Sequence, residues 1–527
     1  MKFEDLLLEI GGFGRFQILI LALLCLPRIN LPMHFLLHNF LAATPSHHCA
    51  IPHQEEFVNL TMEEVLLVSI PRKPDGTFSS CEMFSQPQFH LLLNSSLQPE
   101  NKSIIQHCQH GWVYDHSQFT STISTQWDLV CEQRGLNQAT ATFFFIGVTM
   151  GAMVFGYLSD RFGRKTMLQL SLVCSVVFGM LSAASVSYTM LAITRTLTGV
   201  ALSGLSLIVL PLGLEWVDIQ HRTFTGILSS IFWSIGNMVL ALVAYLVREW
   251  HWLLVAVTGP CVLSIICVWW VPESARWLIA KGKVKQAHRH LLRCARINGR
   301  KDFAVSPEVR NYKNMGGNYS YISLFRTPVL RRISLCSGVV WFGVAFSYYG
   351  MSLNLTGFGL SIYLSQFVFG IIEIPAKMVM YVLVNRVGRR PSQAWTLILT
   401  GTGSLIWANP KIWLPVTGFS EAAFTTVFLY TSELYPTIVR QNGMGYTSFL
   451  ARLGGALAPL VFLLDEVWRS LPEVTYCGVA VCSGAMAFLL PETLNMRLPE
   501  GIEDIEKPHG TEDAGGRRQI RTRAGRS

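Results

Sequence analysis

Stretches of about 20 apolar residues recur along the whole chain, and this pattern constrains its fold more than any other feature. An α-helix needs roughly 20 mostly apolar residues to cross the hydrocarbon core of a membrane. Stretches that satisfy this requirement lie at about residues 16–41, 138–158, 166–187, 189–214, 224–247, 250–271, 332–352, 361–384, 393–409, 411–432, 441–465 and 472–490. We therefore expect an all-α membrane protein with twelve transmembrane helices.

The composition supports this class and excludes others. Only 14% of the 527 residues are charged, whereas a typical soluble domain has about 25%. The sequence has no Gly-x4-Gly-Lys-Ser/Thr phosphate loop, so nothing in it indicates the use of ATP. It also has no assembled nucleophile–base pair and no convincing set of metal ligands, so we expect neither an enzyme nor a cofactor or metal site. The acidic residues Glu4, Asp5 and Glu9 argue against a cleavable signal peptide.

Two long hydrophilic segments interrupt the apolar stretches, and they differ in charge. Residues 42–137 hold ten acidic residues against four Lys and Arg, whereas residues 274–332 hold fourteen Lys and Arg against two acidic residues. Because basic loops stay in the cytoplasm, we expect 274–332 and both termini inside and 42–137 outside. Residues 275–295 are basic and amphipathic, which predicts a helix beneath the bundle or against anionic lipid rather than nucleic-acid binding.

The expected outer segment has two further features of an extracellular location. Its even number of cysteines suits disulfide bonds in an oxidising compartment and allows three pairings. These cysteines are Cys49, Cys81, Cys108 and Cys131. The segment also has sequons for N-linked glycosylation at Asn59, Asn94 and Asn101.

The chain also contains an internal repeat. A basic turn with glycines follows the second apolar stretch, and a shorter version, residues 385–390, follows the eighth. Each turn precedes two stretches that end at an acidic residue, which indicates the parallel six-plus-six repeat of major facilitator transporters. The expected conformational motif comprises Gly156, Asp160, Arg161, Gly163, Arg164, Lys165, Glu215, Arg389, Arg390 and Glu433.

Further motifs give the chain a resemblance to the solute carrier 22 family of organic ion transporters, over essentially its whole length. These motifs are residues 121–131, 272–278, 433–437 and 491–493. Within the family, the chain resembles the organic anion transporter branch, with a particular likeness at residues 11–17, 31–37 and 420–426.

The resemblance implies a major facilitator fold with two pseudo-symmetric six-helix halves, residues 1–271 and 332–490. A cytoplasmic basic linker, 272–331, joins the halves, and 491–527 form a cytoplasmic tail. The implied function is ATP-independent transport of amphipathic organic anions across the plasma membrane, by exchange with a counter-anion or by facilitated diffusion. The resemblance also implies that Cys49 pairs with Cys108 and that Cys81 pairs with Cys131.

Charged residues within apolar stretches are functional candidates, because placing them in a membrane is costly. Arg452 lies midway along the eleventh stretch, and its planar guanidinium suits two-point binding of a carboxylate, sulfate or phosphate. The resemblance implies that Arg452 binds the charge of the substrate, and a structural pair with Asp465 is the alternative. Lys377 matches the cationic site of the branch, although Glu373, four residues earlier, could neutralise it.

The other polar residues of these stretches are weaker candidates. We expect Arg28 to extend towards a membrane interface and Arg195 to belong to a structural motif, and we expect neither to bind substrate. His34 and Asn39 match polar positions that the branch uses in its first helix, but hydrogen bonding between helices explains them equally well.

Aromatic residues are abundant in the stretches expected around the central cavity. An amphipathic anion needs apolar walls with a few directed polar groups. Any single aromatic residue is more often a packing residue, but the set matches the positions that line the cavity in similar transporters. The expected cavity residues are Trp233, Trp341, Tyr348, Tyr349, Phe424 and Phe428.

One interval departs from the pattern of the family. The segment from Arg390 to Glu433 is several residues shorter than the segment from Lys165 to Glu215, so the ninth and tenth stretches have almost no loop between them. We expect these two helices to be short or tilted. Two alternatives to anion transport stay open: an organic cation or carnitine carrier of the same family, and a transport-inactive variant.

Overall fold

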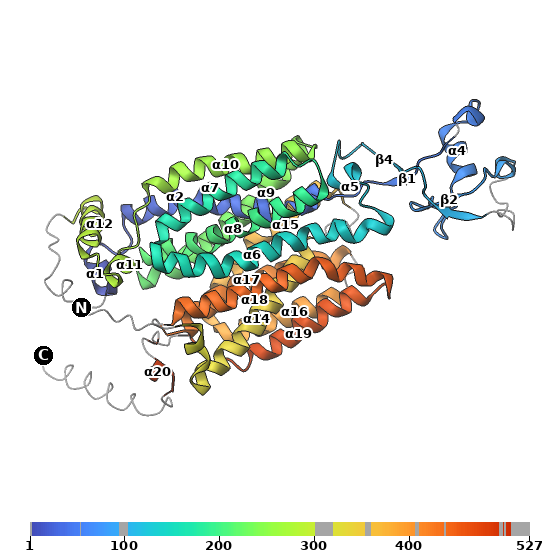
Figure 1. Cartoon of the computed structure of the whole chain (residues 1–527). Helices are drawn as coiled ribbons and strands as arrows, with labels where there is room; N and C mark the ends of the chain where they lie inside the picture. The colour runs from blue at the N-terminus through green and yellow to red at the C-terminus, as the bar shows by residue number, and fades with distance from the viewer. Residues whose placement is uncertain are drawn as a thin grey trace, which may run out of the picture.

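The computed structural model describes residues 3–52, 54–93, 104–300, 320–353, 360–405, 410–436, 439–494, 499 and 502–506. These residues form an elongated bundle of long helices with a small folded segment at one end (Figure 1). We call the end with residues 42–133 the disulfide end. The opposite end is the linker end, with α1 (Phe3–Glu9), α11 (Ala275–Ala280) and α12 (Val284–Ile297).

The long helices form two groups. The first half contains α2 (Arg15–Phe35), α6 (Arg134–Phe162), α7 (Arg164–Ala183), α8 (Tyr188–Glu215), α9 (Ile219–Leu246) and α10 (Trp250–Trp270). The second half contains α14 (Pro328–Ser352), α15 (Ile362–Arg386), α16 (Arg389–Leu405), α17 (Pro410–Leu434), α18 (Arg440–Leu457), its 3-10 extension η6 (Ala458–Glu466) and α19 (Leu471–Ala487). In the described part of the chain, nine of these helices are long and apolar enough to cross a membrane. The mostly helical membrane fold is therefore confirmed.

The first helix differs from its prediction. We expected one helix over 16–41, but α2 ends at Phe35 and a separate short helix, α3 (His38–Leu41), follows it. Leu36 leaves helical geometry with a φ of −104° and a ψ of 6°. Hydropathy does not reveal this break, because the residues on both sides of it are apolar and buried.

The ninth and tenth helices agree in part with the expectation of short helices. Helix α16 has 17 residues, whereas α17 has 25. At 1.5 Å per residue, α16 is about 25 Å long, which is shorter than a typical hydrocarbon core. Residues 406–409, which would join the two helices, lie outside the described residues.

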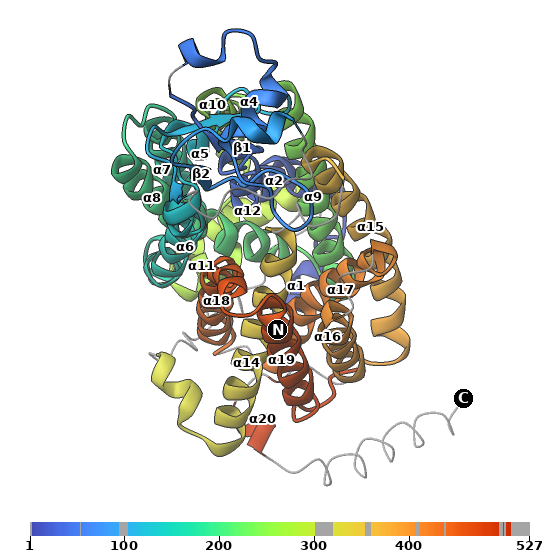
Figure 2. The same ribbon diagram turned by 90° about the vertical axis from the view of Figure 1, so that its right-hand side faces the viewer.

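Close helix packing holds each half together. Helix α6 packs against α8, and α14 packs against α18. A Cβ atom at Gly147 of α6 would lie 2.0 Å from the carbonyl oxygen of Thr196 on α8, so glycine permits this close approach. The pairs α9–α15 and α6–α18 join the two halves, which Figure 2 shows as separate groups seen from the disulfide end.

The segment at the disulfide end has little regular structure. Strand β1 (His47–Cys49) pairs antiparallel with β4 (Trp112–Tyr114), and β2 (Glu82–Phe84) pairs with β3 (Ile105–His107). Its short helices are η1 (Gln54–Phe57), α4 (Met62–Ser69), η2 (Phe89–Leu92), α5 (Ile123–Gln126) and η3 (Cys131–Gln133). Two-stranded sheets are only marginally stable by themselves, so covalent cross-links have a clear structural role here.

At the linker end, the predicted amphipathic helix forms in two pieces, α11 and α12. Gly282 separates them with a φ of +74°, a conformation that glycine adopts without strain. Asn298 then connects the linker to the start of α2, because its Oδ1 accepts the N–H of Phe16 at 2.9 Å. The shorter helices η4 (Tyr321–Phe325) and α20 (Ile502–Glu506) also belong to the described part of the chain.

Candidate functional site

An aromatic cluster lies between the two halves of the bundle, and Phe35 of α2 is at its centre. The ring centroid of Phe35 is 5.7 Å from that of Trp233 on α9 and 6.2 Å from that of Tyr349 on α14. It also lies 5.3 Å and 5.9 Å from the rings of Phe144 and Phe145 on α6. The two halves therefore share an aromatic interior, to which the predicted cavity residues Trp233 and Tyr349 contribute.

Arg452 of α18 faces this aromatic cluster. Its guanidinium carbon lies 5.3 Å from the centre of the Phe35 ring, and its Nη2 donates a hydrogen bond to Ser206 Oγ of α8. Its Nε has no hydrogen-bond partner among the described residues. Asp465, the expected structural alternative, instead pairs with Arg134 at 2.6 Å. In the described part of the chain, Arg452 thus has no carboxylate partner.

Arg28 of α2 lies against the same cluster, which the sequence did not indicate. Its guanidinium carbon is 5.5 Å from the centre of the Trp233 ring, and its Nε donates to the carbonyl oxygen of Ser229 at 3.4 Å. Arg28 also lines a small pocket between α2, α8 and α9. The only sequence signal was a charge inside an apolar stretch, because the direction of a side chain depends on how the helix is rotated in the bundle.

Lys377 of α15 lies in the interior, but it is not a free cation. Its Nζ is 2.8 Å from Glu421 Oε1 of α17 and 3.7 Å from Glu373 Oε2 of α15, and its side chain is fully buried. It also donates to the carbonyl oxygen of Ser230 and to Ser234 Oγ of α9, each at 2.6 Å. Glu373 is the neighbour that helical spacing predicted, whereas Glu421 comes from another helix.

Glu373 is the centre of a polar network that links the halves. Its carboxylate accepts hydrogen bonds from Ser234 Oγ at 2.7 Å and from the hydroxyl of Tyr348 at 2.8 Å. Asn237 Nδ2 contacts both carboxylate oxygens at 3.2 Å. Trp233 Nε1 in turn donates to the Tyr348 hydroxyl at 2.9 Å. Tyr348, a predicted cavity residue, therefore positions the carboxylate of Glu373 and the indole of Trp233.

The other predicted aromatic residues form a second wall. Trp341 of α14 lies 6.3 Å and 5.6 Å from the rings of Phe424 and Phe428 of α17, and its Nε1 donates to Thr431 Oγ1 at 2.7 Å. Phe424 and Phe428 are partly exposed, whereas Trp341 is buried. The ring of Phe424 is also 5.2 Å from that of Tyr348, so the two aromatic walls are continuous.

The two remaining polar candidates of the first stretch lie elsewhere. Asn39 Nδ2 donates to the carbonyl oxygen of Ser352 at 2.7 Å and to Gln366 Oε1 at 3.0 Å, which joins the halves towards the disulfide end. His34 is fully buried, with its Nε2 3.9 Å from Cys261 Sγ of α10. The structure thus places Asn39 at a contact between the halves and His34 at a contact within the first half.

Further contacts close the space between the halves at the disulfide end. Arg134 pairs with Asp465 at 2.6 Å and with Glu466 at 3.3 Å. Slightly deeper, Thr142 Oγ1 of α6 donates to the carbonyl oxygen of Ala456 on α18 at 3.0 Å. The described residues therefore form a conformation in which α6 and α18 are in contact at this end.

The predicted conformational motif forms ion pairs at the linker end. Arg164 Nε lies 3.8 Å from Glu215 Oε1, and Arg389 Nε lies 3.0 Å from Glu433 Oε2, so the two halves repeat the same pair. Other members of the motif have different contacts. Lys165 Nζ donates to the carbonyl oxygen of Trp269, and the guanidinium of Arg161 lies over the Phe162 ring. The backbone N–H of Arg390 donates to the carboxylate of Glu492. The side chain of Asp160 lies outside the described residues.

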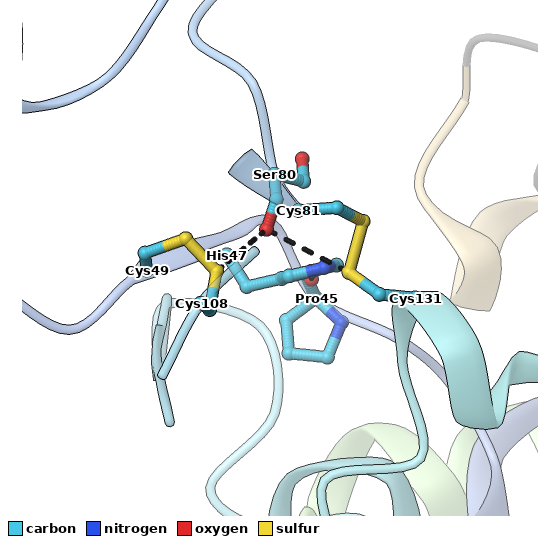
Figure 3. Close-up of a disulfide and its surroundings, with 7 residues drawn as sticks. All are labelled: Pro45, His47, Cys49, Ser80, Cys81, Cys108 and Cys131. Carbon is cyan, nitrogen blue, oxygen red and sulfur yellow. Dashed lines mark hydrogen bonds between the residues drawn. A yellow bond between two sulfur atoms is a disulfide. The ribbon is translucent and has the colours of Figure 1, made fainter. Parts of the chain in front are cut away.

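Both predicted disulfides are confirmed, with Cys49 bonded to Cys108 and Cys81 bonded to Cys131. Figure 3 shows the two bonds on either side of His47, with the carbonyl oxygen of Ser80 against both. His47, Cys81 and Cys131 lie close enough together for a metal site, but the two cysteines are bonded to each other and have no free thiolate for a metal. The sequon at Asn59 is exposed, and those at Asn94 and Asn101 lie outside the described residues.

Comparisons with known proteins agree with this architecture. Residues 125–459 match the Major Facilitator Superfamily. Solute carrier family 22 member 7 of Homo sapiens is 54% identical over 533 residues, which cover 96% of each chain, and its Bos taurus counterpart is 54% identical with the same coverage. Among solved structures, the proton:xylose symporter XylE has a TM-score of 0.60 at 16% identity, covering 93% of this chain and 98% of that one.

The fold and its charged, aromatic interior define a membrane transporter of the major facilitator type, not an enzyme. The chain belongs to solute carrier family 22, as its sequence motifs predicted. Within the family, the chain is similar to member 7, which is organic anion transporter 2.

Proposed function

We propose that this protein carries amphipathic organic anions across the plasma membrane by alternating access, without ATP. The observation that carries the proposal is the pair of interior guanidinium groups of Arg452 and Arg28. Each lies over an aromatic ring, and neither has a carboxylate partner in the described part of the chain. A guanidinium in a site of low polarity binds an anionic group strongly, and the ring beside it gives the apolar part of the substrate a contact surface.

The balance of charges in the interior supports an anion rather than a cation. Arg28, Arg195, Arg452 and Lys377 contribute four positive charges, and Glu373 and Glu421 contribute two negative charges. An uncompensated charge is costly inside a membrane protein, so entry of an anion lowers the free energy of this site and entry of an organic cation raises it. This balance disfavours the cation or carnitine carrier.

The two aromatic walls fit the apolar part of such a substrate. Tyr349 and Trp233 lie beside the arginines, and Trp341, Phe424 and Phe428 extend the apolar surface along α14 and α17. In this arrangement Arg452 and Arg28 bind the charged group, and Lys377 acts mainly through its ion pairs with the two glutamates.

Alternating access requires the two halves to part at each end in turn. The proposed topology has twelve transmembrane helices, with halves 1–271 and 332–490, a cytoplasmic linker 272–331, a cytoplasmic tail 491–527 and the disulfide end outside. In the transport cycle, the contacts of Arg134 and Asn39 open to admit substrate from outside. The ion pairs of Arg164 and Arg389 keep the linker end of each half rigid during this motion.

Uptake measurements in cells with and without the chain test the proposal. The panel contains labelled aromatic carboxylates, aryl sulfonates, sulfate conjugates, dicarboxylates and a tetraalkylammonium cation, and surface biotinylation confirms delivery. We expect uptake of the amphipathic anions and none of the cation. Preloading the cells with an unlabelled anion should accelerate uptake if the carrier works by exchange with a counter-anion. Normal surface delivery with no uptake of any anion would instead support the transport-inactive alternative.

A further inference from the structure

Three buried ionisable residues form a cluster whose charges do not balance. Lys377 lies 2.8 Å from Glu421 and 3.7 Å from Glu373, and the three side chains are at most 3% exposed. One lysine faces two carboxylates, so the cluster has a net negative charge when all three groups are ionised. Proton uptake by one of the two carboxylates removes this local excess of negative charge.

The surroundings of the two carboxylates identify the one that takes the proton. Glu373 accepts hydrogen bonds from Ser234, Tyr348 and Asn237, and such donors stabilise an ionised carboxylate. Glu421 differs, because its Oε1 accepts from Lys377 and Thr425 but its Oε2 is buried with no hydrogen-bond partner among the described residues. A bare anionic oxygen in this position is costly, whereas a protonated carboxyl group carries its hydroxyl there.

We infer that Glu421 binds a proton that is transported together with the organic anion. The inference rests on the proposed transport function and adds the coupling ion to it. One proton from solution binds Glu421 Oε2 when the anion enters, and the same O–H bond breaks when both leave on the opposite side. No other bond forms or breaks, and no redox step is involved.

Electrostatic coupling gives the reason why the proton and the anion bind together. With Glu421 ionised, the interior has an excess of two positive charges, and with Glu421 protonated the excess is three. Proton binding therefore strengthens the attraction for the anion, and the bound anion strengthens proton binding by the same factor. Arg28 interacts electrostatically with both Glu421 and Arg452, so the two sites are within electrostatic reach of each other.

Other groups around Glu421 could contribute to a pH dependence and need to be considered with it. Helix α9 contributes only uncharged groups, Ser230, Ser234 and Asn237, to this cluster. The charged residues Arg389 and Arg390 at the start of α16 lie at the linker end, where they contact Glu433 and Glu492. The titratable or charged groups that face Glu421 are Lys377 and Glu373 on α15, Tyr348 and Tyr349 on α14, and Arg28 on α2.

The cluster also lies where the two halves meet. Lys377 donates to Ser230 and Ser234, and Glu373 accepts from Ser234, all across the α9–α15 contact. A change of charge on Glu421 alters how strongly Lys377 is held in place, and thus alters a contact that must rearrange during transport. Proton binding at Glu421 can therefore influence the conformational change as well as substrate affinity.

The test uses the purified full-length chain in proteoliposomes with a pH-sensitive dye trapped inside. The probe is a radiolabelled aryl sulfonate, because its conjugate acid is too strong to carry protons through the bilayer by itself. Uptake and internal pH are followed at external pH values from 5.5 to 8.5. Glu421→Gln mimics the protonated side chain, and Glu132→Gln, at an exposed residue of η3, is the matched control.

For the parent chain we expect uptake to rise by up to about tenfold per pH unit of acidification, the limit for one proton, with acidification of the vesicle interior when the sulfonate is added. Glu421→Gln should still carry the sulfonate, but with equal uptake at all pH values and no internal acidification. Glu132→Gln should behave like the parent.

Equal uptake by the parent chain at every pH, with no internal acidification, would overturn the inference and leave the proposed transport function intact. Retention of the parental pH dependence in Glu421→Gln would also overturn it, since the proton would then bind elsewhere. If the parent carries no sulfonate at any pH, the proposed function itself is contradicted. The measurements on the parent decide the matter even if Glu421→Gln does not fold.

Discussion

Glu273 and Glu492 occupy equivalent positions in the two halves of the bundle. The carboxylate of Glu273 accepts the backbone N–H of Arg164 at 3.0 Å, at the start of α7. The carboxylate of Glu492 accepts the backbone N–H of Arg389 at 3.0 Å, at the start of α16. Each glutamate therefore satisfies backbone donors in the first turn of a helix, where a negative charge also interacts favourably with the helix dipole.

A glycine precedes each of these helices, and the glutamates explain why. Gly163 and Gly388 have φ values of +110° and +115°. A Cβ atom at Gly163 would lie 2.6 Å from Glu273 Oε2, and one at Gly388 would lie 2.7 Å from Glu492 Oε2. The basic turn of each half and the Pro-Glu pair that follows its last helix, Pro272-Glu273 or Pro491-Glu492, are thus parts of one structural unit.

We predict that Glu273→Gln and Glu492→Gln each destabilise the half to which they belong. The amide keeps the shape but loses the charge, and a hydrogen bond to a charged group contributes about 1.5–3 kcal/mol. Thermal unfolding of the purified protein in detergent should show a lower midpoint than the parent, whereas Glu132→Gln should not. An unchanged midpoint in both glutamate variants would mean that the carboxylate charge is unimportant there.

The anion site gives a second prediction, which concerns Arg452. Arg452→Lys keeps the charge but loses the planar guanidinium, so the rate of anion uptake should fall. Arg452→Asp reverses the sign at the site and should abolish uptake. A buried charge contact typically contributes a few kcal/mol, and each ~1.4 kcal/mol corresponds to tenfold in affinity, so the loss should exceed tenfold.

Surface biotinylation must first show normal delivery of these variants, because an arginine removed from a helix contact can misfold the bundle. Arg28→Lys provides a matched comparison at the arginine that lies over the Trp233 ring. If Arg452→Asp reaches the surface and carries anions at the parental rate, then Arg452 is structural. Arg28 would then become the leading candidate for the substrate's charge partner.

The contrast between Lys377 and Arg28 shows how far the sequence could predict this site. Hydropathy located the long helices, and spacing along one helix identified Glu373 as a neighbour of Lys377. Glu421 was not predicted as a partner, because its contact with Lys377 depends on how α17 packs against α15. The position of Arg28 over Trp233 likewise depends on the rotation of α2, which an almost uniformly apolar stretch does not determine.

The aromatic walls predict a dependence on substrate size. Tyr349→Ala removes apolar surface beside the arginines, and Phe428→Ala removes it from the second wall. The lost contact energy scales with the area that a substrate buries there, at about 25 cal/mol per Å². Uptake of bulky aromatic anions should therefore fall more than uptake of small dicarboxylates. An equal fall for both classes at normal surface density would point to a folding defect.

The disulfides predict a loss of stability confined to one end of the molecule. Replacing Cys81 and Cys131 together by serine removes one of two cross-links from a segment with little regular structure. Such a loss typically costs 2–5 kcal/mol in a small extracellular domain. Limited proteolysis of intact cells should therefore cleave this segment faster than in the parent. Equal cleavage rates would show that the remaining bond and the helix bundle suffice.

The ion pairs at the disulfide end predict how the closed conformation responds to charge. Arg134 lies 2.6 Å from Asp465, so Arg134→Asp replaces attraction by repulsion and should open the contact between α6 and α18. The variant Thr142→Cys reports this opening, because Thr142 is buried beneath the contact. Its cysteine should react with a membrane-impermeant maleimide, added to intact cells, only when the contact is open.

We expect faster labelling of that cysteine in Arg134→Asp than in the parental background, and a return towards the parental rate when Asp465→Arg is added. Exposed ion pairs are weak individually, so the change should be a few-fold rather than complete. The same protein without the Thr142 cysteine gives the labelling of the native thiols, which is subtracted. If Arg134→Asp labels at the parental rate, the apolar contacts of α6 and α18 hold this end closed without help from the ion pair.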